Sequence, residues 1–116
     1  MKTASITSSL AVRTVIATLL RDGDASLQTV ATQLDVSPRS LQRQLMASGT
    51  NFRELVLAVR LQTACQLLVD SELSLTEISC RLGYSGPSGF SRVFKKLMKV
   101  QPVVYRRRQR AATRVG

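Results

Sequence analysis

Three polar side chains in the first half of the sequence are spaced for hydrogen bonding from one face of a helix. Gln42 and Arg43 follow Arg39 at three and four residues, within a segment whose apolar residues recur at helical spacing. In the major groove of DNA, an arginine can donate two hydrogen bonds to a guanine edge, and a glutamine can pair in a similar two-pronged way with adenine. Each of the three residues alone would also fit an ordinary solvated helix face.

A second group combines small and basic residues within a predicted helix over residues 87–98. The candidate contact residues are Ser88, Ser91, Arg92, Lys95 and Lys96, with Lys99 just after the helix. The small side chains let the helix backbone approach DNA closely, the arginine can bind a guanine edge or a phosphate, and the lysines can follow the phosphate backbone. Phe90 and Phe94 are four residues apart, so we expect them to anchor the inner face of this helix. We expect Val93 and Leu97 beside them.

The sequence contains few residues suited to catalysis or metal binding. It has no histidine, and its acidic residues are Asp22, Asp24, Asp35, Glu54, Asp70, Glu72 and Glu77. Two carboxylates that converge on one cleft are hard to build from these positions, so we expect neither an enzyme nor a catalytic residue. We interpret Cys65 and Cys80 as small core residues, because a metal site would need more ligands. We therefore predict no metal site and no cofactor.

Charge is concentrated toward one end of the chain. The formal net charge is +10 in 116 residues, and nine Lys or Arg but no Asp or Glu occur from Arg92 to Gly116. Such asymmetry is typical of a protein that meets nucleic acid or an anionic membrane surface. For Arg106 to Arg110 alone, a solvated basic tail is an equal alternative. There is neither an apolar run long enough to cross a bilayer nor a signal-peptide pattern, so we expect a cytoplasmic protein without membrane contact.

Apolar periodicity and capping residues predict an all-α chain of seven helices without a strand. The predicted helices cover about residues 10–21, 27–34, 38–48, 52–70, 75–82, 87–98 and a short segment from 102. Caps are predicted at Ser26, Ser37, Asn51 and Ser74, with Glu54 and Glu77 completing capping boxes. Gly49 is expected to supply a left-handed exit after the third helix.

The chain contains an internal repeat of a short capped helix, a tight turn and a second helix entered through proline. Cap and apolar positions of residues 26–37 recur forty-eight places later, and positions 41, 43 and 45 recur forty-nine places later, after one inserted residue. This is the layout of a helix-turn-helix, whose second helix lies in the DNA major groove. A plain helical hairpin is the alternative, but a hairpin need not repeat both its turn and its basic residue.

Two segments, VATQLDVSPRSLQRQL and LTEISCRLGYSGPSGFSRVFKKLMKVQPVVYRR, resemble the DNA-binding domain of the AraC/XylS family of bacterial transcription regulators. The resemblance covers roughly residues 9–108. It implies a homeodomain-like fold with two helix-turn-helix subdomains joined by a long central helix. It also implies sequence-specific reading of two successive major grooves of double-stranded promoter DNA, and a contact with RNA polymerase.

By position, the resemblance assigns the DNA contacts to Arg39, Gln42 and Arg43 in the first subdomain and to Ser88, Ser91 and Arg92 in the second, with Lys95 near the backbone. We expect residues 1–50 to form the first subdomain, 51–71 a linker helix and 72–116 the second subdomain with a basic C-terminal tail. A helix over 52–70 would be about 28 Å long, and successive major grooves lie about 34 Å apart. One such helix and the half-widths of two subdomains would bridge that distance. Because the repeat is direct and its copies differ, we expect a monomer on one asymmetric site.

Some residues depart from the family pattern. Lys99 stands where a glycine is usual, so the exit of the helix over 87–98 is expected to be either strained or changed in geometry, and Gln101 replaces the usual serine. Asp35 occupies a turn position where a small residue is common. Two alternatives to a regulator are a basic helical adaptor for an acidic partner and an architectural DNA binder without promoter choice. Many family members carry an N-terminal sensing domain, so this sequence is either a stand-alone regulator or the DNA-binding piece of a longer one.

Overall fold

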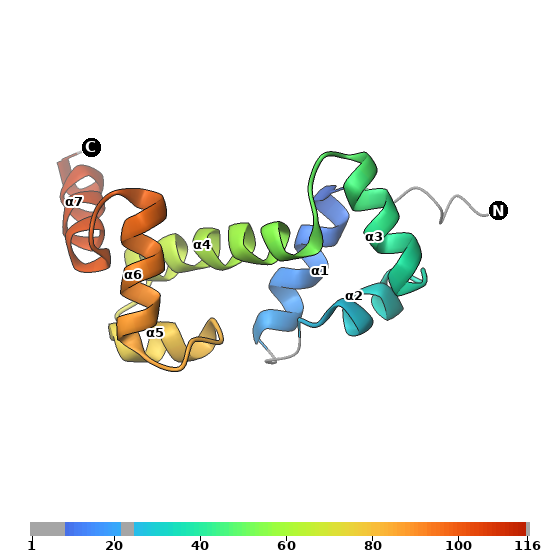
Figure 1. Ribbon diagram of the computed structural model, residues 1–116. Helices are drawn as coiled ribbons and strands as arrows, with labels where there is room; N and C mark the ends of the chain where they lie inside the picture. The colour runs from blue at the N-terminus through green and yellow to red at the C-terminus, as the bar shows by residue number, and fades with distance from the viewer. Residues whose placement is uncertain (1–8, 22–24, 116) are drawn as a thin grey trace. The chain divides into compact units, whose positions relative to one another are not determined.

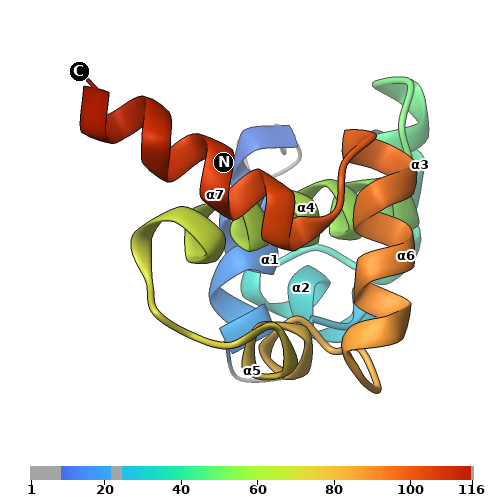
Figure 2. The same ribbon diagram turned by 90° about the vertical axis from the view of Figure 1, so that its left-hand side faces the viewer.

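The computed structural model describes residues 9–21 and 25–115, and it is entirely helical apart from the connecting turns within these ranges (Figures 1 and 2). The helices are α1 (Ser9–Arg21), α2 (Leu27–Gln33), α3 (Pro38–Ala47), α4 (Phe52–Asp70), α5 (Leu75–Arg81), α6 (Pro87–Met98) and α7 (Pro102–Val115). The predicted all-α fold of seven helices is confirmed. The last helix is longer than expected, because it continues through the basic run to Val115. None of the helices in the described ranges has both the length and the apolarity needed to cross a bilayer.

Side-chain caps fix the starts of the short helices. The Oγ of Ser37 accepts a hydrogen bond from the N–H of Ser40 at 3.0 Å. At α5, the Oγ of Ser74 accepts from the N–H of Glu77 at 3.1 Å, and the N–H of Ser74 donates to the Glu77 carboxylate at 2.9 Å. These bonds satisfy amides that a first helical turn leaves without partners. The predicted caps at Ser26, Ser37 and Ser74 are confirmed.

The start of α4 differs in one detail from the prediction. As expected, the Oδ1 of Asn51 accepts a hydrogen bond from the N–H of Glu54 at 2.9 Å. The carboxylate of Glu54 accepts a hydrogen bond from the Oγ1 of Thr50 at 3.2 Å, and Thr50 is one residue before the capping residue Asn51. The side chains of residues 50, 51 and 54 therefore hold this helix start together.

The two helix-turn-helix turns repeat the same hydrogen bond. The N–H of Val36 donates to the carbonyl of Ala31 at 3.0 Å, and the N–H of Tyr84 donates to the carbonyl of Ser79 at 2.9 Å. Donors and acceptors are both forty-eight residues apart, which is the spacing of the repeat in the sequence. The repeat is therefore present in the backbone as well as in the residue pattern.

Left-handed backbone occurs at the two turns and after the two second helices. The residues with positive φ are Asp35 (59°), Lys99 (69°), Gly49 (85°) and Gly83 (90°). A side chain in this region costs about 1–2 kcal/mol, a cost that glycine avoids. Gly49 ends α3 without this cost, whereas Lys99 ends α6 with it, and its N–H donates to the carbonyl of Lys95 at 2.8 Å. The strained exit expected at Lys99 is therefore present.

The chain divides into two compact units, Met1–Arg60 and Leu61–Gly116, and the boundary falls inside α4. Each unit has its own apolar core. The buried residues of the first core are Val12, Ile16, Leu19, Leu20, Val30, Ala31, Leu41, Leu45, Leu55 and Val59. Those of the second core are Ala64, Leu68, Ile78, Leu82, Phe90 and Phe94. The first half of α4 thus belongs to one core and its second half to the other.

A row of aromatic rings forms the centre of the second core. Phe90 and Phe94 are only 2% and 1% exposed, which confirms them as the inner face of α6. The ring centroids lie 5.8 Å apart for Tyr84 and Phe90, 5.7 Å for Phe90 and Phe94, and 5.5 Å for Phe94 and Tyr105. Tilted and edge-on rings at such distances are the favoured packing of aromatic side chains. The row therefore joins the turn before α6 to α7.

Leu97 was predicted beside the two phenylalanines, and this prediction is wrong. Its side chain is 40% exposed. The residues of α6 that pack into the second core are Phe90, Phe94 and Met98, which follow one another at intervals of four. Leu97 lies within about 20° of Phe90 around the helix axis, so its exposure reflects the lack of covering residues at this end of α6 and not the direction of its side chain.

The two cysteines differ in their surroundings. Cys65 is partly buried, as expected for a core residue, but Cys80 is exposed, so its assignment to the core is wrong. The short helix α5 buries its other side through Ile78 and Ser79. A hydrogen bond between the hydroxyl of Tyr105 and the Cys65 side chain, together with burial, raises the pKa of Tyr105. Cys65 therefore takes part in the packing of α4 against α7.

Candidate nucleic-acid interface

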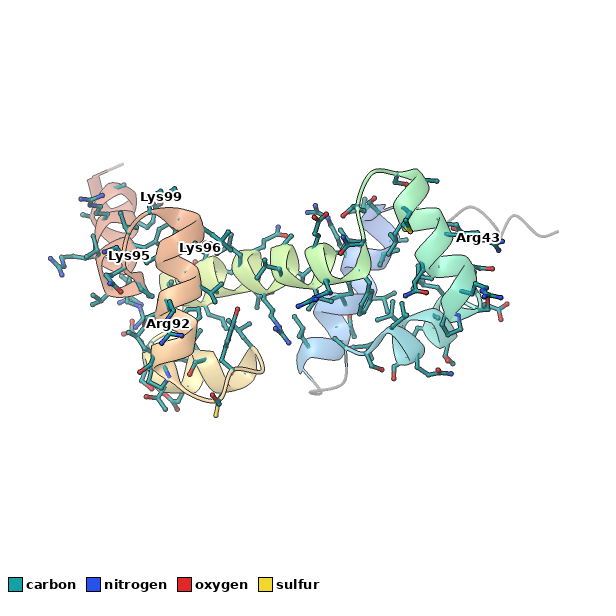
Figure 3. All side chains as sticks on the ribbon, in the orientation of Figure 1. Arg43, Arg92, Lys95, Lys96 and Lys99 are labelled. Atoms are coloured by element: carbon teal, nitrogen blue, oxygen red, sulfur yellow. The ribbon has the colours of Figure 1, made fainter. Side chains whose placement is uncertain are left out.

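The three polar residues predicted on α3 lie on its exposed side. Arg39, Gln42 and Arg43 are all exposed, whereas Leu41 and Leu45 are 0% and 1% exposed. Because each residue turns the helix by about 100°, the leucines point into the first core and the polar residues point away from it. Figure 3 shows Arg43 on this helix. The first unit therefore presents a polar face on the second helix of its helix-turn-helix.

Arg43 retains most of its hydrogen-bonding capacity. One terminal nitrogen of its guanidinium lies 3.5 Å from the Oγ of Ser40, one turn earlier in α3. That distance is at the long end for a hydrogen bond, and a guanidinium has five N–H donors in a planar fork. The side chain can therefore swing outward to meet two acceptors of a base edge at once.

The predicted contact residues of α6 line one open groove of about 670 Å³ in the second unit. The lining residues are Ser88, Ser91, Arg92, Lys95, Lys96, Lys99 and Gln101. All five residues predicted on this helix are thus brought together, and Figure 3 shows the basic ones along one side of α6. None of the lining residues is acidic, so the groove is strongly positive. A polyanion is the ligand that such a surface would attract.

The groove also contains two residues that follow α6, of which Lys99 was predicted as a phosphate contact and Gln101 was not. Lys99 and Gln101 follow α6 and complete the lining at its C-terminal end. Both residues are departures from the family pattern. The place of Gln101 in the groove could not be found from helical periodicity, because the left-handed turn at Lys99 ends the regular spacing before it.

The small residues at the start of α6 leave its backbone open. A Cβ at Gly86 or Gly89 would meet no atom within 4 Å apart from the adjoining backbone. The absence of side chains there is therefore not required by packing inside the described part of the chain. It is consistent with the expectation that small residues allow a ligand to approach the helix closely.

Arg106 has a structural role that the sequence reasoning missed. Its Nε donates to the carbonyl of Leu68 at 2.7 Å, and one terminal nitrogen donates to the carbonyl of Leu73 at 2.8 Å and to that of Ser71 at 3.2 Å. Arg110 also donates to Ser71, at 2.6 Å. The last carbonyls of a helix need such donors, so both arginines hold the end of α4.

This contact corrects two interpretations of the basic run. Arg106 is neither part of a solvated tail nor available for a phosphate, because its guanidinium is occupied by backbone carbonyls. Arg110 is partly occupied as well, and forms an ion pair with Glu72 at 3.3 Å. Arg107 and Arg108 are exposed, so they remain free of this role. No signal in the sequence alone distinguishes Arg106 and Arg110, which bind backbone carbonyls, from the exposed Arg107 and Arg108.

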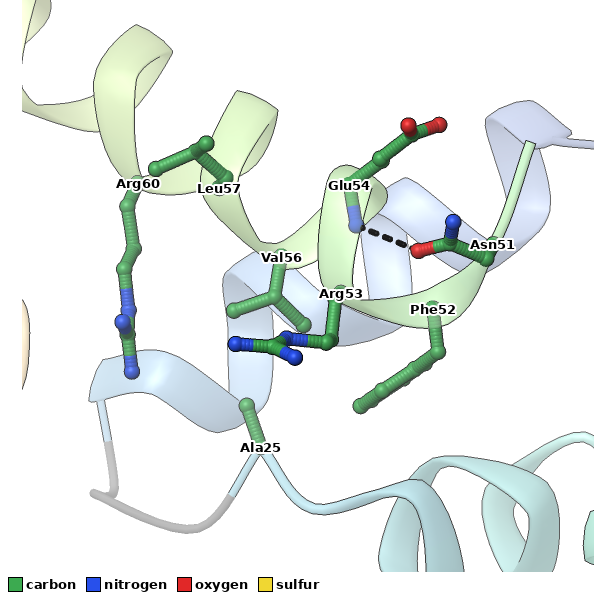
Figure 4. A pocket seen from close by; sticks show the side chains of 8 residues that line it. All are labelled: Ala25, Asn51, Phe52, Arg53, Glu54, Val56, Leu57 and Arg60. Atoms are coloured by element: carbon green, nitrogen blue, oxygen red, sulfur yellow. Dashed lines mark hydrogen bonds between the residues drawn. The ribbon is translucent and has the colours of Figure 1, made fainter.

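A second hollow of about 610 Å³ lies in the first unit, beside the start of α4 (Figure 4). Its lining residues are Ala25, Asn51, Phe52, Arg53, Glu54, Val56, Leu57 and Arg60. The predicted contact residues of α3 are not among them. This hollow is therefore a feature separate from the exposed face of α3.

Comparison with known proteins identifies the family. The model of a helix-turn-helix domain family matches residues 30–108. An uncharacterized helix-turn-helix-type transcriptional regulator of Mycobacterium tuberculosis is 43% identical over 79 residues, which make up 68% of this chain and 23% of that protein. The chain thus spans about a quarter of the length of such curated relatives.

Solved structures agree with this match. The C-terminal domain of AraT, a response regulator from Geobacillus stearothermophilus, is 37% identical and covers 85% of this chain and 83% of its own, with a TM-score of 0.68. A transcriptional regulator from Chromobacterium violaceum, one of the AraC-type DNA-binding domain-containing proteins, is 28% identical with a TM-score of 0.68, over 85% of this chain and 92% of that one. The family match begins in α2 and ends in α7, and so includes both helix-turn-helix units. This chain therefore belongs to the AraC-type family of helix-turn-helix DNA-binding domains, which are parts of transcriptional regulators and not enzymes.

Proposed function

We propose that this chain binds double-stranded promoter DNA as a monomer, with α3 in one major groove and α6 in the next. The observation that carries the proposal is the division of both helices into a buried apolar side and an exposed polar side. Leu41 and Leu45 are buried in α3, and Phe90 and Phe94 are buried at the matching positions of α6. The residues proposed to contact DNA lie on the exposed sides. Each helix follows a turn that contains the same backbone hydrogen bond, as expected for a helix-turn-helix.

In the first half-site, α3 reads bases. Arg39 and Arg43 are candidates for forked hydrogen bonds to guanine, and Gln42 is a candidate for adenine. All three are exposed and are carried by a helix that its own core fixes through two leucines. Long side chains on a fixed helix can reach base edges with little additional ordering of the backbone.

In the second half-site, α6 holds the DNA backbone. Arg92 is the residue that can fork onto a base edge, and Ser88 and Ser91 have short reach. Lys95 and Lys96 neutralise phosphates, which contributes affinity through counterion release and no sequence preference. The all-basic groove supports this role, since its charged lining residues are all positive.

Selection of binding sites from random duplexes at one fixed salt concentration tests the proposal. We expect an enriched asymmetric site with two separated blocks of preference, bound by one chain. Footprinting and the mass of the complex in solution would give the extent of protection and the stoichiometry. Enrichment of palindromes alone, with two chains per site, would contradict the monomer. No enrichment over random duplex would instead favour an architectural binder.

RNA polymerase is proposed as the protein partner, with the family resemblance as its support. Because binding energies of two ligands are reciprocal, a direct contact must strengthen the binding of both proteins to one promoter fragment. The measurement is the affinity of each protein for a fragment with the selected site, with and without the other. Independent binding at several spacings of the selected site would contradict the contact.

A further inference from the structure

A methionine lies on the exposed face of α3 among the proposed base-reading residues. Met46 is 71% exposed, although it is one of the larger apolar side chains of the first unit. From Arg39, the residues at +3, +4 and +7 are Gln42, Arg43 and Met46. With about 100° per residue, Met46 lies within about 20° of Arg39 around the helix axis and between the directions of Gln42 and Arg43. It is therefore in the middle of the polar face.

The internal repeat gives this position a counterpart. The forty-nine-residue offset that relates α3 to α6 matches Arg39 with Ser88, Gln42 with Ser91, Arg43 with Arg92 and Met46 with Lys95. In the second unit, the four matching residues line one groove together. By this correspondence, Met46 completes the surface that the three polar residues of α3 begin.

The chemistry of the two matched positions differs. Lys95 is a cation suited to phosphate, whereas the thioether of Met46 is apolar and flexible. On the major-groove edges of the base pairs, the apolar feature that side chains read is the C5-methyl group of thymine. A long, unbranched and polarisable side chain can adapt its shape to such a group.

We propose that Met46 is a specificity-determining residue that contacts the C5-methyl group of a thymine in the half-site of α3. The inference rests on the proposed function, since it requires α3 to lie in the major groove. It adds a preference for thymine to the guanine and adenine preferences assigned to the arginines and the glutamine.

A cycle that combines a protein variant with a single-methyl change in DNA tests this inference. After the site has been selected, each thymine of the α3 half-site is replaced by uracil, which removes only the C5-methyl group. We expect one or two of these replacements to weaken binding by the wild-type chain about fourfold, as expected for the loss of one buried methyl-sized group. Met46→Ala should bind thymine and uracil forms alike, and Met46→Leu should retain the preference.

Three controls make the result specific. Leu10→Ala removes an apolar side chain of similar exposure, 73%, from α1, and should leave the preference for thymine intact. Uracil in the α6 half-site should be unaffected by any change at Met46. Met46→Lys introduces the residue type found at the matching position, Lys95. This variant should lose the preference for thymine, and the salt dependence of its DNA affinity should become steeper by about one unit.

The outcome would overturn the inference if wild type and Met46→Ala responded equally to every uracil in the α3 half-site. Arg43→Ala separates this failure from a failure of the proposed function. If Arg43→Ala still relaxed the choice of one base pair, α3 would remain the reading helix and only the role of Met46 would be lost. If no variant of α3 changed any base preference, the proposed function itself would fail.

Discussion

At the scale of single residues, the arginines and lysines of the exposed faces are chemically distinct. Arg43 and Arg92 occupy matching positions of the repeat, each on the exposed side of its helix. A planar fork can select one base edge, whereas the ammonium group of Lys96 is a point charge that interacts with any phosphate. The two residue types should therefore differ in what their loss does to sequence preference.

We expect Arg43→Ala and Arg92→Ala to cost about 1–3 kcal/mol of binding free energy and each to relax preference at one base pair. Lys96→Ala should weaken binding to all sequences alike and lower the salt slope by about one unit. Affinities for the selected site, its single-base variants and random duplex would be measured across a salt series. Arg13→Ala, which removes an exposed cation of α1, is the control. A uniform loss for all three variants would contradict the assignment of the arginines.

Lys99 combines a strained backbone with a place in the basic groove. We expect Lys99→Gly to raise the free energy of unfolding by about 0.5–1 kcal/mol, because relief of left-handed strain exceeds the added freedom of the unfolded chain. The same variant should bind DNA more weakly, with a salt slope lower by about one unit. Chemical denaturation and a salt series would measure the two effects. Unchanged affinity would show that the side chain does not contact DNA.

Lys99→Arg and Lys99→Asn separate charge from backbone. The arginine variant keeps both the cation and the strain, so it should resemble the wild type. The asparagine variant removes the cation but tolerates the left-handed region, so it should lose affinity as the glycine variant does.

At the scale of the helices, adding a side chain near the start of α6 should have opposite effects on protein stability and on DNA binding. An alanine at Gly89 would meet no atom within 4 Å, and alanine favours a helix over glycine. We expect Gly89→Ala to stabilise the fold by up to about 1 kcal/mol but to weaken DNA binding by about 1–3 kcal/mol, if the added methyl group is crowded against DNA. Thermal unfolding and binding assays would be compared, with Ser91→Ala as a variant that adds no bulk. Unimpaired binding would place this part of α6 away from the DNA.

The capping box of α5 makes the stability of the fold depend on pH in the acid range. Hydrogen bonds from the backbone and side chain of Ser74, and then the charge of Arg81, lower the pKa of Glu77 below its ordinary 4.5. A lowered pKa in the folded state contributes stability that is present above the unfolded pKa and is lost as pH falls through the folded one. We expect Glu77→Gln to reduce the loss of stability between about pH 4.5 and lower values, since glutamine keeps the cap without a titrating charge.

Thermal unfolding from neutral pH into this acid range measures the effect of the capping box. Ser74→Ala removes the partner and keeps the carboxyl group, so it should also flatten the acid dependence, from a lower starting stability. A loss of stability identical in all three proteins would show that Glu77 contributes nothing to it.

The sequence was sufficient for features that depend on near neighbours in the chain. The caps at Ser37 and Ser74 bond to residues three positions away, so their types and spacing were enough to place them. The repeat of residue types was enough to identify the second helix of each helix-turn-helix. The buried row of Phe90 and Phe94 followed from helical spacing alone.

Features that depend on distant residues could not be read in this way. Arg106 bonds to the carbonyl of Leu68, 38 residues earlier, and a basic run contains no mark that one arginine is occupied and its neighbour is free. The exposure of Cys80 and Leu97 depends on which side other helices cover. The place of Gln101 in the groove depends on the direction in which the chain leaves α6.

At the scale of the whole molecule, the two units should contribute unequally to specificity. The first has long polar readers and the second has small residues among cations, so its affinity comes mainly from phosphates and DNA shape. We expect scrambling of the α3 half-site to weaken binding more than scrambling of the α6 half-site, at a cost of about 1–3 kcal/mol for each important base pair. The measurement is the affinity for each scrambled site, from competition binding at one fixed salt concentration. A duplex with both half-sites scrambled gives the baseline affinity. Equal penalties, or a larger one for the α6 half-site, would contradict this division.

The contact of Arg106 with the end of α4 also has a consequence for the order in which a ribosome can complete the protein. All buried residues of the first core precede Arg60, so the nascent chain contains that core before the helices of the second unit exist. The last carbonyls of α4 receive their hydrogen bonds from Arg106 only later, because this arginine is translated 38 residues after Leu68. Vectorial synthesis thus favours folding of the N-terminal unit first. The second unit can close only after Arg106 has been translated.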